Sequence, residues 1–162
     1  MSGFTHLHVH SQYSILDGQS GLKAMVAKAK QNGMPALALT DHGSMFGVKE
    51  FFNEIQKINK CVFESIADAE KKGISTEELK AQLLKPIIGC EMYVAPGSRF
   101  EKKKAENQKT YHHLILLAKN STGYHNLLKL VSLGWLEGYY HRPRIDKEIL
   151  KKYSEGIIAT SA

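Results

Sequence analysis

The sequence predicts an α/β fold in which successive strands and helices form a parallel β/α barrel that stops before closure. Apolar runs with strand character alternate along the chain with segments of helical periodicity, as in a parallel sheet with crossover helices. Polar residues gather where these strands end, which favours a barrel over an open sheet. A closed barrel takes roughly 250 residues. This chain of 162 residues is therefore expected to be the N-terminal part of one domain covering residues 1–162.

The first half of the chain is expected to contain two strands, each followed by a helix. Residues 5–10 alternate apolar and histidine side chains, as a short strand does. Residues 36–40 form an apolar run without alternation, as expected for a strand buried on both faces. Gly33 is placed to end the first helix. The apolar positions of the helices are Leu22, Met25, Val26 and Ala29, and then Val48, Phe51, Phe52, Ile55 and Ile58.

Residues 61–85 are expected to be a helical insert made of two short helices. Gly73 interrupts the helical pattern, and Ser75 with Glu78 forms a capping box ahead of a second apolar group. The residues of this insert indicate no particular function.

The second half of the chain is expected to add strands and helices in the same alternation. Ser121 or Thr122 can cap a helix with five apolar positions, and a short helix is expected to begin after Asp146. A charged loop separates the first two of the predicted strands, which are residues 87–94, 114–118 and 157–159.

The composition argues against a membrane protein and against a secreted protein. A hydrophobic content of 43% with 23% charged residues is that of an ordinary globular domain. The net charge of +6 and the pI near 9.2 favour polyanionic partners such as nucleic acid. Cys61 and Cys90 form no CxxC pair, and no run approaches the roughly 18 apolar residues of a membrane span. With no secretory leader at the start, we expect a soluble, cytoplasmic protein that does not enter membranes.

Three histidines near the N-terminus are the first candidates for metal binding. In a strand, His6, His8 and His10 would point to the same side. Imidazoles on one face can share a metal, and neutral histidine suits zinc, iron and manganese. The triplet alone is equally typical of the polar face of a half-exposed strand.

Carboxylates and histidines also follow the other predicted strands. Asp17 and Asp41 are each compatible with a turn or cap as well as with a ligand, as is His42. Glu91 is placed where a buried apolar residue would be expected, and burying it without a partner would cost several kcal/mol. A cluster of this composition suits two or three metals that activate water and neutralise a phosphate ester.

These segments resemble the successive motifs of the PHP (polymerase and histidinol phosphatase) domain. The matching stretches span the chain and are HLHVHSQYSILDG, LALTDHGSMFG, IIGCEMYV and YHHLILLAKN. The later stretch NSTGYHNLLKLVSLGWLEGYYHRPRIDKEIL resembles more specifically the N-terminal PHP domain of bacterial DNA polymerase III alpha subunits. The resemblance implies a distorted, TIM-like β/α barrel of the PHP type, truncated before closure.

Carried over residue by residue, the resemblance implies metal ligands and supporting residues. Of the adjacent pair His112 and His113, the second fits the family position because it directly precedes the Leu-Ile-Leu-Leu run. His6 and Asp41 would support ligands without binding metal. The family supplies further ligands from strands beyond Ala162, so this chain cannot complete the site. The implied ligands are His8, His10, Asp17, His42, Glu91 and His113, for two or three ions of zinc, manganese or iron.

The resemblance implies a function only for the longer parent protein. That protein would be a DNA-directed DNA polymerase that uses magnesium, with primer-template DNA and other replicase subunits as partners. Its PHP site would hydrolyse phosphodiesters as a 3′ to 5′ exonuclease. Two alternatives are a structural or docking domain without catalysis, and a free-standing phosphoesterase of the histidinol phosphatase type. The chain itself has none of the regions needed for polymerisation.

Further groups could contact nucleic acid. The basic loop of residues 99–109 and the pair Arg142 and Arg144 could contact phosphates, although a solvated loop is the commoner role of such charges. Tyr139 and Tyr140 beside Arg142 resemble a platform for base stacking, but buried aromatic residues are commoner than such platforms.

Overall fold

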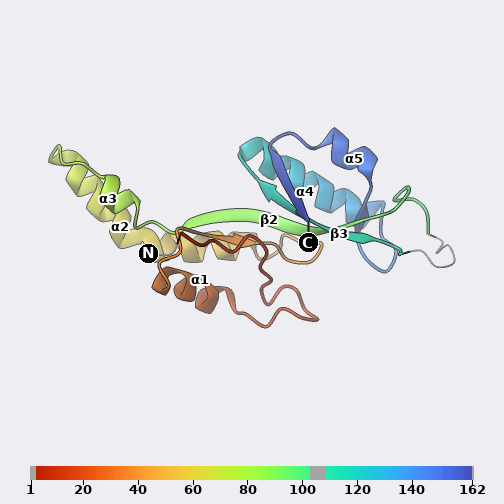
Figure 1. Cartoon of the computed structure of the whole chain (residues 1–162), viewed down its shortest axis with the longest axis horizontal. Coiled ribbons are helices and arrows are strands. Elements are labelled where there is room, and N and C mark those ends of the chain that lie inside the picture. The colour runs from red at the N-terminus through yellow and green to blue at the C-terminus, as the bar shows by residue number, and fades with distance from the viewer. Residues whose placement is uncertain (1–2, 103–108, 162) are drawn as a thin grey trace. The chain divides into compact units, whose positions relative to one another are not determined.

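A computed structural model describes residues 3–102 and 109–161, and Figure 1 shows its elements in chain order. The chain divides into two compact units, of which the first is Met1–Leu39 with Gly47–Ile87. The second is Thr40–Phe46 with Ile88–Ala162. Each unit combines helices with strands, so the chain is a mixed α/β protein. No helix in the described part of the chain is both long enough and apolar enough to cross a membrane.

The first unit packs two helices around a short buried strand. Helix α1 (Leu22–Gln31) contacts both α2 (Val48–Lys71) and β1 (Ala36–Leu39), and β1 is buried along its whole length, as its apolar run predicts. Gly33 has a φ of 67°, the left-handed conformation predicted for the end of α1. The buried side chains of this unit include Leu22, Val26, Ala29, Leu37, Leu39, Phe51, Ile55 and Leu84.

The predicted strand at residues 5–10 is wrong. The segment is irregular and bends at Leu7 and His8, and one hydrogen bond, from the Ala38 N–H to the His6 carbonyl (3.0 Å), ties it to β1. Alternation fixes a strand only where one face is buried. Leu7 is 43% exposed, so the apolar positions here have no core to face.

Of the two short helices predicted at 61–85, the first is wrong and the second is present as a single turn. Helix α2 continues unbroken to Lys71, and Gly73 follows it with a φ of 68°. No glycine or proline interrupts residues 59–72, so nothing ends the helix earlier. Helix α3 (Glu77–Lys80) is a single turn whose N-cap is Thr76 rather than Ser75, and Thr76 makes no side-chain capping bond.

The strands of the second unit form a mixed sheet instead of the expected parallel one. Strand β3 (His112–Ala118) pairs antiparallel with both β2 (Lys85–Val94) and β5 (Ile157–Ser161), and β4 (Arg144–Ile145) pairs parallel with β2. Parallel neighbours need a crossover, usually a helix. The described residues between β2 and β3 contain no helix, so the chain turns back on itself. Over the described residues, the sheet does not close into a barrel.

Two helices cover one face of this sheet. Helix α4 (Ser121–Leu136) packs on β3, β4 and β5. Its N-cap is Asn120, whose side chain accepts a hydrogen bond from the Gly123 N–H, so the predicted cap at Ser121 or Thr122 is wrong. Helix α5 (Lys147–Lys152) begins directly after Asp146, as predicted, and the Asp146 side chain caps it. The shared core contains Cys90, Met92, Leu116, Leu127, Leu130, Ile145 and Ile149.

A buried polar network holds the loop after β2. The Arg99 guanidinium donates to Asp146 (3.0 Å) and Glu137 (2.7 Å), and both Arg99 and Asp146 are buried. Arg144 is 3% exposed and donates to the main-chain carbonyls of Arg99, Glu101, Thr110 and Gly138. The expectation that Arg144 contacts DNA is therefore wrong, because its donors are engaged inside the protein. Residues 103–108 of the predicted basic loop lie outside the described residues.

Candidate metal centre

Strand alternation in β2 directs Glu91 away from the helices. Cys90 and Met92 point into the core beneath α4 and α5, so Glu91 and Tyr93 lie on the opposite face of the sheet. In the antiparallel register Tyr93 pairs with His113, which places His113 on the same face as Glu91. His112 pairs with Val94 and faces the other way. The sheet therefore separates the two adjacent histidines, as alternation predicts.

His42 reaches Glu91 through main-chain pairing. It lies in the segment that follows β1 and forms a parallel bridge with Glu91. The Gly43 N–H donates to the Glu91 carbonyl (2.8 Å), and the Glu91 N–H donates to the Asp41 carbonyl (3.1 Å). Two backbone hydrogen bonds thus hold these ligand candidates side by side, whatever their side chains bind.

Two imidazole side chains converge on one carboxylate oxygen of Glu91. His42 Nδ1 lies 3.5 Å from Glu91 Oε1, and His113 Nδ1 contacts the same atom. One potential ligand atom from each residue lies within 4.8 Å of the others. The Glu91 side chain is 4% exposed and that of His113 is 42% exposed. A carboxylate this deeply buried needs a cationic or hydrogen-bonding partner, and the cluster has one side open to solvent.

The donor set of this cluster fits a divalent metal. Imidazole nitrogen suits zinc, iron and manganese, and a carboxylate with two oxygens can bind one ion or bridge two. The Tyr93 ring lies against both histidine rings, with centroids 6.0 Å from His42 and 5.2 Å from His113, so it supports their orientation. Sequence reasoning missed Tyr93, although its position two residues after Glu91 on a strand places both on one face.

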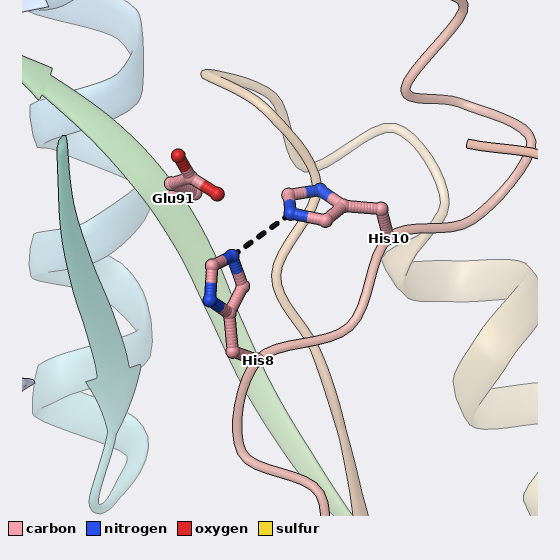
Figure 2. Close-up of side chains that lie close together, drawn as sticks. All are labelled: His8, His10 and Glu91. Atoms are coloured by element: carbon pink, nitrogen blue, oxygen red, sulfur yellow. Dashed lines mark hydrogen bonds between the residues drawn. The ribbon is translucent and has the colours of Figure 1, made fainter. Parts of the chain in front are cut away.

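In the first unit, His8 and His10 lie together. Their Nε2 atoms are 2.9 Å apart (Figure 2), and the other ring nitrogen of His10 lies 3.2 Å from Ser14 Oγ. The bend in the chain brings the rings together, not the strand geometry expected from the sequence. The two Nε2 atoms share a hydrogen bond, so both rings point the same nitrogen toward one place, as two ligands of one metal would.

The remaining predicted site residues behave differently. Asp17 is exposed in the turn after the histidines, where its N–H donates to the Ser14 carbonyl (3.1 Å). Asp41 is buried, and its carbonyl accepts from the Glu91 N–H and the Cys90 thiol. Burial raises the pKa of the Cys90 thiol far above its usual range, so it stays protonated within the core.

The model of the PHP domain family matches residues 6–162 of the chain. The chain belongs to the PHP domain family. Its PHP sequence is similar to DNA polymerase III subunit alpha of Chlamydia pneumoniae, with 50% identity over 155 residues, covering 96% of this chain and 11% of that protein. The corresponding protein of Borreliella burgdorferi is 50% identical over 161 residues, covering 99% of this chain and 12% of that protein. The PHP chain thus spans about a tenth of the length of these curated relatives.

A solved structure also resembles this PHP chain. It is described as a putative metal-dependent phosphoesterase from Bifidobacterium adolescentis and covers 79% of this chain and 32% of its own. The TM-score is 0.42 at 16% identity, and a similarity at this level adds nothing to the assignment of the fold or the site.

Proposed function

We propose that this PHP chain is the N-terminal part of a bacterial DNA polymerase III alpha subunit, and that its site hydrolyses phosphodiesters as a 3′ to 5′ exonuclease. The observation that carries the metal part of this proposal is the convergence of His42 and His113 on the buried Glu91 carboxylate. The identity of 50% over nearly the whole chain favours the polymerase parent over a free-standing phosphatase. The fold of the parent's complete domain would be a TIM-like barrel of the PHP type.

The proposed ligands are the six residues expected from the sequence and the family resemblance. Two or three ions of zinc, manganese or iron, when bound, would supply Lewis acids that activate water and neutralise the scissile phosphate. Within the second unit, Glu91 supplies a carboxylate that its burial keeps away from water, and the half-exposed His113 lies at the side open to solvent. The ligands are His8, His10, Asp17, His42, Glu91 and His113.

A comparison of adjacent histidines tests this function in the full-length polymerase subunit. We would measure bound metal by mass spectrometry and digestion of a 3′-labelled primer in wild type, Glu91→Gln, His113→Ala and the matched control His112→Ala. We expect the first two variants to lose both metal and digestion, because they remove donor atoms from the cluster. His112→Ala should keep both, because His112 faces away from Glu91.

The other outcomes separate the alternatives. Metal loss in the variants without primer digestion by the wild type would indicate a structural or docking role. Unchanged metal content in Glu91→Gln and His113→Ala would contradict the proposed centre itself. Polymerase activity of every variant, measured in parallel with magnesium, reports whether the protein is folded.

A further inference from the structure

Two exposed aromatic rings stack on each other at the end of α4. Trp135 is 46% exposed and Tyr139 is 52% exposed. Their ring centroids are 5.5 Å apart and their planes differ by 17°, so they form a stack with its outer surface in solvent. Large apolar rings are normally buried, and an exposed pair with parallel planes is suited to contact another flat ring.

The aromatic pair is fixed next to the candidate metal centre. Trp135 Nε1 donates to the carbonyl of Gly43 (2.8 Å), the residue that follows His42. A Cβ on Gly43 would lie 2.6 Å from Pro143 and 3.2 Å from the Tyr93 ring, so the segment after Tyr139 packs closely against this part of the site. Rings held this way keep their orientation before any ligand arrives, which lowers the entropy cost of binding.

A guanidinium group lies over the Tyr93 ring and interacts electrostatically with Tyr139. Arg142 is half-buried, with its guanidinium carbon 5.7 Å from the centre of the Tyr93 ring, whose own neighbours are His42 and His113. Its hydrogen bond with Tyr111 raises its pKa, which keeps it charged. None of the ion pairs among the described residues includes Arg142, so no carboxylate there neutralises its charge.

The neighbouring cations have other roles. Lys102 Nζ donates to the carbonyls of Glu137 and Tyr139 (2.8 Å each) and thereby holds the loop that carries Tyr139. Arg99 and Arg144 are buried and engaged with carboxylates and main-chain carbonyls. Arg142 is thus the cation of this group best placed to meet a phosphate.

We propose that Trp135, Tyr139 and Arg142 form a binding site for single-stranded nucleic acid, in which a base stacks on the aromatic pair and a backbone phosphate pairs with the guanidinium. Every base has a π-face, so stacking of this kind tolerates any sequence. The planar guanidinium binds phosphate through paired hydrogen bonds. The combination of stacked rings with an adjacent cation matches a nucleotide better than a purely apolar partner. The site needs no metal, so it stands independently of the hydrolysis proposed above.

The test uses Trp135 as its reporter, because it is the single tryptophan of the chain. The full chain would be titrated with a thymidine dodecamer and, in parallel, with an abasic dodecamer of equal charge. Both titrations are done in EDTA, so the result does not depend on metal binding. We expect the thymidine strand to quench Trp135 fluorescence and to bind more tightly than the abasic strand.

Matched variants separate the two contacts. Tyr139→Ala should weaken binding of the thymidine strand roughly 5- to 150-fold, the usual effect of removing one stacked ring, and Tyr139→Phe should retain affinity. Arg142→Gln should reduce the slope of log affinity against log salt by about 0.7, the value for one phosphate contact on a single strand. Lys129→Gln, which removes an exposed charge elsewhere on α4, should leave this slope unchanged.

Three results would overturn the proposal. One is the absence of quenching by the thymidine strand while circular dichroism shows a folded chain. Another is equal binding of the abasic and thymidine strands, which would leave the rings without a role. The third is an unchanged affinity in Tyr139→Ala combined with a loss in Leu136→Ser, because that pattern indicates a general apolar surface for a protein partner.

Discussion

Substitution of Asp146 by alanine tests whether the buried polar network stabilises the second unit. The main-chain N–H and Nη1 of Arg99 both donate to Asp146 Oδ2 (2.9 and 3.0 Å), and Asp146 Oδ1 accepts from the Ile149 N–H at the start of α5 (3.1 Å). The Arg99 side chain is 9% exposed and that of Asp146 is 4% exposed. The substitution removes a helix cap and one partner of a buried charge together.

The expected loss follows from these two contributions. An N-cap contributes about 1 kcal/mol. Removing one member of a buried ion pair costs about 3–5 kcal/mol, and the lower end applies here because Glu137 still accepts from Arg99 Nε (2.7 Å). We therefore expect Asp146→Ala to reduce the free energy of unfolding by about 4 kcal/mol. Asp146→Asn keeps a capping oxygen, so its cost should be about 1 kcal/mol smaller.

Urea denaturation followed by Trp135 fluorescence measures these costs, because Trp135 lies in the second unit. Adding Arg99→Met to Asp146→Ala should restore much of the loss, since no buried charge is then left without its partner. A cost below about 1 kcal/mol for Asp146→Ala would refute this account. So would a double variant less stable than Asp146→Ala alone.

The same carboxylate sets a dependence of stability on pH. Burial alone would raise the pKa of Asp146, but its hydrogen bonds with Arg99 and Ile149 outweigh burial and lower the pKa below the ordinary value of 3.8. A pKa that is lower in the folded state stabilises the protein above the unfolded value, and this contribution disappears as the pH falls through the folded value. Asp146→Asn should therefore flatten the loss of stability below about pH 4, measured by urea midpoints across pH.

Two further substitutions should change stability without touching the candidate metal centre. Asn59 is 2% exposed, and its side chain makes two hydrogen bonds to the main chain. We expect Asn59→Ala to reduce the free energy of unfolding, measured by urea denaturation, by about 1–3 kcal/mol. The control Asn53→Ala changes an exposed side chain and should have little effect. Gly123→Ala would place a Cβ 1.8 Å from the carbonyl oxygen of Gly156 and should reduce the free energy of unfolding by at least about 2 kcal/mol. The control Gly97→Ala meets only a flexible side chain and should be tolerated. Equal melting temperatures of the two variants would contradict the close packing of Gly123 against Gly156.

Much of the helix and strand content follows from local patterns. The apolar positions of α1 and the left-handed conformation of Gly33 could be predicted because helical periodicity and capping are local properties. Strand direction was predicted wrongly, because it depends on how the chain travels between strands. The charged link before β3 already lacked a helical pattern, and that absence was the available sign of an antiparallel return.

The candidate site was predictable to the extent that strand geometry creates it. Placing His113 rather than His112 on the face of Glu91 needs only the period of two and a register. The approach of His8 to His10 arises from an irregular bend, which no periodic pattern encodes. Trp135 was missed because its indole N–H finds its partner at Gly43, far away in the sequence.

Strand β3 is apolar on both faces, so burial alone does not select its alignment with β2. A shift by one position in one direction would set His113 opposite Met92, a fully buried residue, and would desolvate the imidazole. The opposite shift would leave Glu91 facing Leu116 and remove the contact between its carboxylate and His113. His113, which is proposed to bind metal, therefore also favours the observed alignment of β3 with β2. We expect a substitution of His113 to affect this alignment as well as metal binding.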